Sequence, residues 1–475
     1  MYIYENQDGE AHVAIADQGQ LPLLQTIAWT LQRQVIAELA SAQDIAAALN
    51  SIDVDDSPST AVGASAQPAS YSEADEDTID ALRDLASGAP VVHAVNEIIE
   101  LALARRATDI HLEPMRNGFR VRIRVDGILT NLRTFAVELG RPIVSRVKIL
   151  AALNIAERRL PQDGRMGIRA GGAEVDIRVA TMPTSFGEAA ILRLLQRDRG
   201  IQAFSEIGLS ARDYEAFELA LRAPHGMIVV TGPTGSGKTT TLAAALSTLN
   251  DTTRKILTIE DPIEYEIEGV SQSQIKPSIG LTFANALRAF LRQDPDVIMV
   301  GEMRDAETVR VGIQASLTGH LVLTTLHTNT AAAAITRLVD LQVEPFLLSA
   351  SLRCIVAQRL VRKLCVHCRR QTRADAKFLA KDPRYSVFAV NGAIIWEPGR
   401  CERCAGTGYN GRRAVFEVLS VNEKVRGMIS RGATEEEIEG ASKAAGMTTL
   451  IEDGVRVALL GETSLDEILR VTASR

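Results

Sequence analysis

A glycine-rich segment near the middle of the chain constrains the fold more than any other feature. The apolar run Met227–Val230 leads into Gly232-Pro-Thr-Gly-Ser-Gly-Lys238-Thr239, and a helix is expected over Thr240–Leu249. Glycines let the main chain curl tightly enough to aim several backbone N–H groups at one phosphate. The helix directs its positive dipole end at the same anion. The pattern predicts a strand, a phosphate-binding loop and a helix, and hence a site for a nucleoside triphosphate.

Each part of this loop has an expected contact with ATP. Lys238 would neutralise the β and γ phosphates, and the Thr239 hydroxyl would bind Mg²⁺. A glycine-rich turn would match by chance in roughly a few percent of chains this long, and the flanking strand and helix make chance less frequent still. The predicted nucleotide-binding residues are Gly232, Pro233, Thr234, Gly235, Ser236, Gly237, Lys238, Thr239 and Thr240.

Length and composition fit a globular protein of several domains. The 475 residues correspond to about three domains by the length prior. Aromatic residues make up 4% of the chain and the formal charge is −7, which leaves few stacking platforms for bases and argues against nucleic acid as a partner. No apolar run approaches the ~18 residues of a membrane span, and the first residues lack the order of a signal peptide. We therefore expect a cytosolic protein.

Composition and periodicity divide the chain into six segments and predict an α/β multidomain fold. Residues 11–50 show the pattern of a strand, a helix, a strand and a helix, at Val13–Ala16, Leu23–Gln32, Val35–Ile36 and Gln43–Leu49. Residues 51–77 are rich in Ser, Ala, Asp, Glu and Pro, as in a solvated linker. Alternating strands at Arg120–Val125 and Glu174–Val179 follow an amphipathic helix that starts at Pro90. A short polar hinge is expected over residues 197–200. The predicted segments are 1–50 (α/β module), 51–87 (linker), 88–196 (second α/β domain), 201–352 (nucleotide domain), 353–415 (cysteine pairs) and 416–475 (helices).

A second apolar run, Asp296–Val300, ends in Gly301-Glu302 and has the form of a Walker B strand. The Glu302 carboxylate would then lie at the carboxyl edge of the sheet beside the phosphate loop. There it could hold Mg²⁺ through water or polarise the attacking water. Such an ending is common by chance, but the glycine loop upstream strengthens the catalytic interpretation.

Other titratable residues lie between and after these two motifs. Glu260, Asp261 and Glu264 crowd three carboxylates into five residues, which is costly without a cation or a proton. They form either a metal-facing or water-activating cluster, with Glu260 and Glu264 as its catalytic members, or a solvated turn broken by Pro262. His320 and His327 flank the apolar run that follows. Either histidine could sense the γ-phosphate, although a histidine near a core strand is usually satisfied by ordinary hydrogen bonds.

Four of the five cysteines form two C-x2-C pairs, Cys365/Cys368 and Cys401/Cys404. Four thiolates suit a tetrahedral Zn²⁺ ion, and the long intervening loop is easily closed because loop entropy grows only logarithmically. His367 could replace one cysteine as a ligand, and Cys354 is expected to be an inert buried thiol. Two redox pairs are the alternative, but neither pair starts a helix as in a thioredoxin. The pattern predicts a structural zinc site.

Taken together, these motifs resemble the secretion superfamily ATPases of type II secretion and type IV pilus assembly. The glycine loop, the acidic box Glu260–Glu264, Gly301-Glu302 and the histidine box His320–His327 occur in that family's order and spacing. The resemblance extends from about residue 88 to the C-terminus. Four further motifs match, at Asp109–Pro114, Arg122–Gly127, Asn154–Arg165 and Arg178–Thr184.

The resemblance implies a homo-hexameric ring of ATP hydrolases. The nucleotide domain would be RecA-like and the preceding domain PAS-like, with ATP between them and Mg²⁺ held by Thr239 and Glu302. Arginines of the preceding domain would close over the phosphates, with Arg122, Arg124 and Arg146 as candidates. Alternation places Arg122 and Arg124 on one strand face with Arg120, which is unfavourable unless an anion lies opposite. A solvated basic face is the alternative.

The resemblance also implies a cellular role. ATP hydrolysis would drive pseudopilus assembly and protein export by type II secretion, with the chain associated peripherally with the bacterial inner membrane. An inner-membrane secretion-platform protein would bind the N-terminal module, because residues 11–50 resemble the last part of the family's docking domain. The alternatives are a type IV pilus extension ATPase, a zinc-bearing nucleic-acid translocase and a scaffold with a silent nucleotide site.

Overall fold

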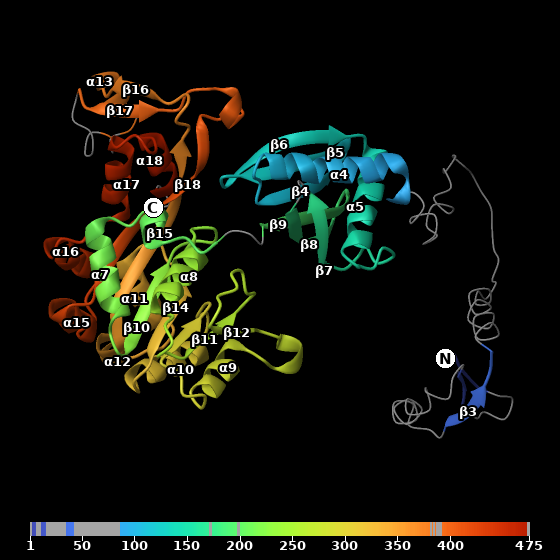
Figure 1. The fold of residues 1–475 in the computed structure, drawn as a ribbon, viewed down its shortest axis with the longest axis horizontal. Coiled ribbons are helices and arrows are strands. Elements are labelled where there is room, and N and C mark those ends of the chain that lie inside the picture. The colour runs from blue at the N-terminus through green and yellow to red at the C-terminus, as the bar shows by residue number, and fades with distance from the viewer. Residues whose placement is uncertain are drawn as a thin grey trace, which may run out of the picture. The chain divides into compact units, whose positions relative to one another are not determined.

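The structure is a computed structural model that describes residues 2–5, 11–15, 35–41, 86–170, 173–196, 200–380, 382, 385 and 392–472 (Figure 1). The chain divides into two units, Met1–Glu73 and Ala74–Arg475. Among the described residues, none of the helices has both the length and the apolar character that spanning a membrane requires.

The first unit contains a small sheet of three strands in the order β1-β2-β3. Strand β1 (Tyr2–Glu5) is antiparallel to β2 (Ala11–Ile15), and β2 is parallel to β3 (Val35–Leu39). Two of these strands, β2 and β3, confirm the predicted strands at Val13–Ala16 and Val35–Ile36, whereas β1 was not predicted. The helices expected at residues 23–32 and 43–49 and the linker at 51–77 lie outside the described residues.

The second unit begins with a six-stranded antiparallel sheet in the order β6-β5-β4-β9-β8-β7. Helices α4 (Ala89–Ala104) and α5 (Val137–Leu150) pack on one face over apolar residues such as Val121 and Ile177. Helix α4 confirms the helix predicted from Pro90, and the two predicted strands lie within β5 and β8. The strands are β4 (Asp109–Met115), β5 (Gly118–Val125), β6 (Ile128–Phe135), β7 (Gln162–Ala170), β8 (Ala173–Thr184) and β9 (Gly187–Gln196).

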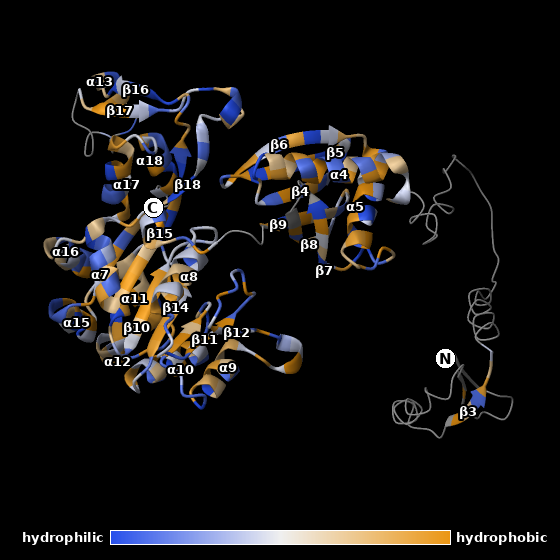
Figure 2. Ribbon diagram, in the orientation of Figure 1, coloured by the Kyte–Doolittle hydropathy of each residue, from blue (hydrophilic) through white to orange (hydrophobic). Residues whose placement is uncertain are grey.

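A seven-stranded sheet follows, in the order β12-β11-β13-β14-β10-β15-β18. All neighbouring strands are parallel except β15 and β18, which pair antiparallel. The central strands are fully buried and appear as apolar segments in Figure 2. The strands are β10 (Gly226–Thr231), β11 (Ile256–Glu260), β12 (Ser271–Gln274), β13 (Val297–Val300), β14 (Leu321–Leu326), β15 (Leu352–Leu364) and β18 (Tyr409–Ser420).

Helices cover both faces of this sheet because its strands are apolar on both sides. On β10, Ile228 and Val230 face one core while Met227 and Val229 face the other. The first core includes residues of α6 (Phe204–Ile207), α7 (Ala211–Leu221) and α8 (Lys238–Leu249). The second includes residues of α9 (Phe283–Phe290), α10 (Ala306–Leu317), α11 (Ala331–Asp340) and α12 (Pro345–Ser351). A 3₁₀ turn, η3 (Pro277–Ile279), lies between β12 and α9.

The seven-stranded sheet does not end at residue 352, where the sequence pattern placed a domain boundary. Strands β15 and β18 belong to it, and between them the described residues of 365–408 form an insertion, here named the cysteine insertion, whose Phe378 and Ile395 side chains join the second core (Figure 1). The predicted boundary falls inside the sheet because two strands joined by a long insertion give no local sign of their pairing. The insertion contains β16 (Arg370–Arg373), α13 (Ala376–Leu379), β17 (Ile394–Glu397) and η4 (Glu402–Cys404).

The last described residues form helices that pack against the second core of the seven-stranded sheet. This agrees with the helical character expected for residues 416–475, except that β18 extends to Ser420. Of the hinge expected at residues 197–200, only Gly200 is described. The helices are α15 (Glu423–Ser430), α16 (Glu435–Ala444), α17 (Leu450–Leu459) and α18 (Leu465–Thr472).

Candidate functional site

The glycine segment forms a tight loop between the buried strand β10 and helix α8, as its sequence predicts. Gly232 and Gly237 have φ values of 152° and 89°, in the region that favours glycine. A Cβ atom on Gly232 would lie 2.5 Å from the Gln358 carbonyl oxygen and 2.6 Å from Ser236 Oγ. Helix α8 starts at Lys238, two residues before the predicted start, so the lysine belongs to its first turn. The loop therefore brings its backbone N–H groups to a helix amino end, where an anion is favoured.

Lys238 is buried and bonds to the loop itself. Its Nζ donates to the carbonyl oxygens of Gly232 at 2.7 Å and Pro233 at 3.2 Å. Burial lowers the pKa of Lys238 to about 8, although the nearby Glu302 carboxylate acts in the opposite direction. Ser236 Oγ is buried beside it without a hydrogen-bond partner in the described residues. A bound phosphate would give both groups a strong partner and would favour the charged lysine.

Glu302 follows β13, and its carboxylate raises the pKa of Lys238 against the effect of burial. Its side chain is 14% exposed; Arg304 Nε lies 2.6 Å from Oε1, and His327 Nε2 lies 3.4 Å from Oε2. Strand β14 lies between β10 and β13, so the loop and Glu302 face each other across one intervening strand. His327 follows β14, the intervening strand, and therefore lies between the phosphate loop and Glu302. The structure therefore brings Lys238, Glu302 and His327 to one edge of the sheet.

The structure separates the two histidines of the histidine box. His320 precedes β14, at the opposite edge of the sheet from the phosphate loop. Its Nδ1 lies 3.0 Å from the Ala315 carbonyl oxygen, an ordinary loop contact. Because parallel strands place their carboxyl ends at one edge, only His327 reaches the edge that carries Glu302. Between the two, His327 is the better candidate for a phosphate sensor.

The acidic box is also divided. Glu260 ends β11 and is 5% exposed; Thr258 Oγ1 and Gln272 Nε2 donate to its Oε1 at 2.6 and 2.9 Å. Burial raises the pKa of Glu260, and these two hydrogen bonds oppose that effect. Glu264 lies on the following turn and is exposed. The fold therefore relieves the predicted crowding of charge by burying the hydrogen-bonded Glu260 carboxyl and exposing the Glu264 carboxyl. Glu260 fits a catalytic cluster, and Glu264 fits a solvated turn.

Several contacts of the loop involve residues that sequence reasoning missed. Thr231, the last residue of β10, accepts the N–H of Thr328 at 2.9 Å, and the two hydroxyls are 2.7 Å apart. Thr241 on α8 donates to Gln358 Oε1 at 2.7 Å. Gln358 lies on β15, next to β10, so only the order of strands reveals its proximity to the loop. No local motif marks it.

The six-stranded sheet carries a row of charged residues on the face opposite its helices. Cross-strand pairing aligns Arg165, Arg178, Arg193, Asp109 and Arg124 across β7, β8, β9, β4 and β5. Asp109 accepts from Arg193 Nε at 3.0 Å and lies 3.7 Å from Arg124 Nε. Directly opposed like charges destabilise a sheet. The single aspartate neutralises only part of the row.

The candidate arginines Arg122 and Arg124 already have carboxylate neighbours within this domain. Arg122 donates to both oxygens of Glu113, at 2.5 and 2.8 Å. The anion that three arginines on one face seemed to require is thus supplied by β4, which sequence alternation alone could not show. Arg146 comes from α5, which packs on the other face of the sheet, so the structure does not group it with Arg122 and Arg124.

Arg178 is different from these neighbours. Its Nε is buried, and neither Arg178 nor Arg165 forms an ion pair or hydrogen bond within the described part of the chain. Burial and the adjacent Arg165 guanidinium lower the pKa of Arg178, and the carboxylates of Glu264 and Asp261 act in the opposite direction without forming an ion pair with it. A partly desolvated arginine that forms no hydrogen bond or ion pair with a carboxylate favours an anion as ligand.

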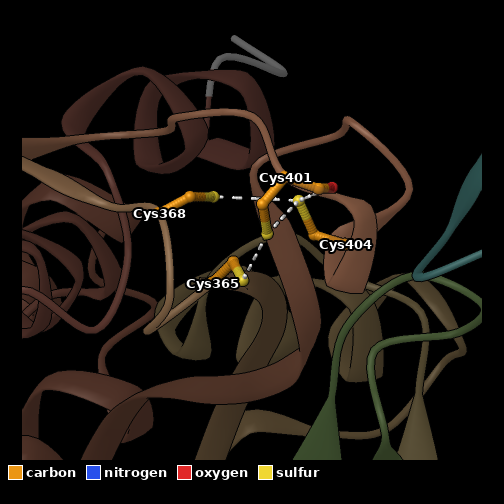
Figure 3. A group of neighbouring side chains, drawn as sticks. All are labelled: Cys365, Cys368, Cys401 and Cys404. Carbon is orange, nitrogen blue, oxygen red and sulfur yellow. Dashed lines mark hydrogen bonds between the residues drawn. The ribbon is translucent and has the colours of Figure 1, made fainter.

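The four predicted cysteines converge at one end of the cysteine insertion (Figure 3). Their sulfur atoms all lie within 4.8 Å of one another, and three neighbouring pairs are 3.6, 3.7 and 3.8 Å apart. A tetrahedral ion with bonds of about 2.3 Å requires sulfur atoms about 3.8 Å apart, so the donor set fits Zn²⁺. His367 instead contacts Arg403, which donates to its Nε2 at 2.8 Å. Cys354 is fully buried and burial raises its pKa to about 12, as expected for an inert thiol.

The glycine loop on a parallel sheet, with a carboxylate at the same edge, defines a class of enzyme that binds and hydrolyses ATP. The chain belongs to the type II/IV secretion system protein family, whose profile matches residues 84–470. Type II secretion system protein E of Xanthomonas campestris pv. campestris is 49% identical over 419 residues, 87% of this chain and 73% of that protein. The type IV pilus assembly ATPase PilB of Thermus thermophilus is 46% identical over 378 residues, 80% of this chain and 42% of that protein.

Solved structures agree with this assignment. The pilus retraction motor PilT with bound ADP superposes with a TM-score of 0.51 at 29% identity, over 79% of this chain and 96% of that one. The ATPase DotB of Legionella pneumophila gives a TM-score of 0.57 at 23% identity, over 79% of this chain and 94% of that one. The second likeness concerns the fold alone.

Proposed function

We propose that this chain is the ATPase that drives protein export by type II secretion, as a homo-hexamer at the cytoplasmic side of the bacterial inner membrane. The observation that carries the proposal is the identity of 44 to 49% to proteins named type II secretion system protein E. The seven-stranded domain would be RecA-like and the six-stranded domain PAS-like. An inner-membrane secretion-platform protein would bind the N-terminal module.

The arrangement of the nucleotide edge supports a specific division of labour. Lys238 would leave the carbonyl oxygens of its own loop and bind the β and γ phosphates, and Thr239 and Glu302 would hold Mg²⁺ directly or through water. Glu302 would also orient and polarise the attacking water, while His327, 3.4 Å from it, would contact the γ-phosphate. Glu260 would support this edge from its buried position. Hydrolysis would release the contacts that close one domain on the other.

The native bacterium provides the test of the proposed role. Deletion of the gene should leave the substrates of type II secretion inside the cell, and the intact gene should restore their export. Loss of surface pili with unchanged export would instead support the second candidate, a type IV pilus extension ATPase, which the similarity to PilB favours. Stimulation of ATP hydrolysis by DNA or RNA would instead support the alternative that the chain is a nucleic-acid translocase.

We also propose that Arg178 contacts the phosphates of bound ATP, with Arg165 and Arg193 beside it in the same row. Arg122, Arg124 and Arg146 remain candidates, although two of them have carboxylate neighbours. A partly buried guanidinium that forms no ion pair can bind a phosphate and stabilise charge that develops in the transition state.

Replacement of Arg178 by glutamine should therefore lower kcat/KM for ATP by about 100-fold or more. Steady-state hydrolysis by the full-length assembled protein measures this effect. Arg120→Gln is the matched control, because Arg120 lies on the same sheet face but pairs with Glu113 at 3.1 Å. It should change kcat/KM only slightly, and equal losses in both variants would contradict a phosphate contact specific to Arg178.

The cysteine cluster fits zinc as a structural ion, and we propose that it binds one. Cys365, Cys368, Cys401 and Cys404 would supply all four ligands, which leaves no position for a reacting water. When bound, the ion would cross-link the two ends of the cysteine insertion. The lobe would then offer a folded surface for a membrane partner.

A further inference from the structure

Glu417 on β18 lies at a junction that the nucleotide chemistry above does not use. The residue is 2% exposed. Its Oε1 accepts the backbone N–H of Ala331, the first residue of α11, at 2.8 Å, and its Oε2 accepts that of Leu450, the first residue of α17, at 3.2 Å. Each helix directs a partial positive charge at this carboxylate. One buried side chain therefore joins the amino ends of two helices that are distant in sequence.

Helix α11 connects Glu417 to the nucleotide edge, the edge of the seven-stranded sheet that carries Lys238, Glu302 and His327. Residues 327–331 connect β14 to α11, and each of the five has a contact that holds it in place. Thr328 bonds to Thr231 at the start of the phosphate loop, and Asn329 accepts from Arg359 at 2.8 Å. His327 lies beside Glu302. A change in this 327–331 segment would therefore reach Ala331 and Glu417 directly.

The α17 side leads to the cysteine insertion. Helix α17 has 10 residues, a length of about 15 Å, and Gly461 follows its carboxyl end. Trp396 of β17 packs so closely there that a Cβ atom on Gly461 would lie 2.8 Å from the indole ring. Arg369 stacks on the Trp396 ring at 4.6 Å and donates to the Gly461 carbonyl oxygen at 2.5 Å. The amino end of α17 thus contacts Glu417, and its carboxyl end contacts the cysteine insertion.

Helix α17 is also tied to β18 along its length and capped at its start. Asp453 is 1% exposed and accepts the Phe416 N–H at 3.0 Å, one residue from Glu417. Thr449 and Glu452 form a reciprocal capping box around the amino end. These bonds anchor the first turn of α17 to β18.

We propose that Glu417 is a positioning residue that couples the 327–331 segment to α17, and that α17 transmits the nucleotide state to the cysteine insertion. The inference rests on the proposed nucleotide site. Phosphates that draw Lys238 and His327 toward them would move the 327–331 segment. Because both oxygens of Glu417 are engaged, α11 and α17 shift together and alter the surroundings of Trp396. Coupling of this kind is demonstrated only by a measured change near Trp396 when nucleotide binds at the other end of the path.

Tryptophan fluorescence can measure that link in the full-length protein. The chain has two tryptophans, Trp29 and Trp396, so Trp29→Phe leaves Trp396 as the only indole. We expect the emission of Trp396 to change when a non-hydrolysable ATP analogue binds with Mg²⁺. Calorimetry reports binding independently. Absence of binding would contradict the proposed nucleotide site, whereas binding with no change in Trp396 emission would contradict the coupling alone.

A pair of substitutions at Leu450 isolates the hydrogen bond to Glu417. Proline suits the first position of a helix and removes only the N–H, so Leu450→Pro deletes this bond while α17 can still form. Leu450→Ala removes more of the side chain than Leu450→Pro does but keeps the N–H, so it controls for lost packing. We expect the emission change to persist in Leu450→Ala and to vanish in Leu450→Pro, with analogue affinity within a few-fold in both. Equal responses in the two variants would overturn the proposal.

Glu417→Gln provides a second, independent variant. Glutamine has one acceptor oxygen, so it can hold the amino end of only one helix at a time. The emission change should therefore be lost while the analogue still binds. Glu452→Gln, on the same helix, preserves the capping box and should leave the response intact. Circular dichroism confirms that each variant is folded, and a response retained in Glu417→Gln would contradict the role of this carboxylate.

Discussion

Replacement of Glu302 by glutamine should reduce the rate of ATP hydrolysis by about 100- to 1,000-fold, with nucleotide affinity within a few-fold of the original. Glutamine has nearly the same shape but cannot accept a proton from the attacking water. The partners of this side chain, Arg304 at 2.6 Å and His327 at 3.4 Å, hold it at the edge that the phosphate loop occupies. Steady-state turnover and equilibrium binding of a non-hydrolysable analogue separate the two effects.

Glu307→Gln is the matched control for this prediction. Glu307 lies in the first turn of α10, is 61% exposed and pairs with Arg288 at 2.6 Å, so it shares the charge of Glu302 but not its place at the edge. Its replacement should leave turnover unchanged. Undiminished turnover in Glu302→Gln would mean that another carboxylate activates the water. Glu260 would then be the next candidate, because it is buried at the adjacent strand end.

The phosphate loop could be predicted from sequence because all of its determinants are local. A buried strand, glycines with positive φ and a following helix lie within about twenty residues, and each has its own sequence signature. The cysteine cluster was predictable for a similar reason, since thiols at C-x2-C spacing have few uses in a reducing compartment. Only the start of α8 differed, at Lys238 instead of Thr240.

Features that depend on strand order could not be predicted in this way. The position of β14 between β10 and β13 brings His327 to Glu302 and sends His320 to the opposite edge. The pairing of β15 with β10 brings Gln358 next to the loop, and its pairing with β18 across the cysteine insertion places the predicted boundary at residue 352 inside a sheet. Each of these follows from pairing between distant segments, for which alternation along one strand carries no information.

The arginine candidates illustrate the same limit. Alternation correctly placed Arg122 and Arg124 on one face of β5, but the carboxylates that neutralise them come from β4. Arg178 could not be distinguished from other arginines of the chain, because its buried Nε and its lack of an ion pair in the described residues depend on the cross-strand row. A sequence pattern identifies charges, whereas only the fold shows which charges remain unpaired.

Removal of zinc should unfold the cysteine insertion without unfolding the seven-stranded sheet. Structural zinc contributes about 10–16 kcal/mol in small zinc domains, far more than any single contact in this lobe. Strands β15 and β18 are buried in the sheet on either side of the insertion, so they stay paired when the lobe opens. We therefore expect Cys365→Ser with Cys401→Ser to abolish metal binding, expose residues 365–408 to protease and weaken membrane docking or assembly, while hydrolysis by assembled hexamers persists.

Metal content, limited proteolysis, binding to native membranes and turnover measure these four outcomes on one preparation. Cys354→Ala is the matched control, because Cys354 is buried in β15 and its sulfur is not a member of the cluster. It should retain the metal and the docking. If stoichiometric removal of zinc instead abolishes turnover in an assembled hexamer and leaves membrane binding intact, the ion serves the nucleotide site and not the surface of the insertion. A persistent effect on docking alone would make residues 365–408 the part of the chain that communicates with the membrane partner, alongside the N-terminal module.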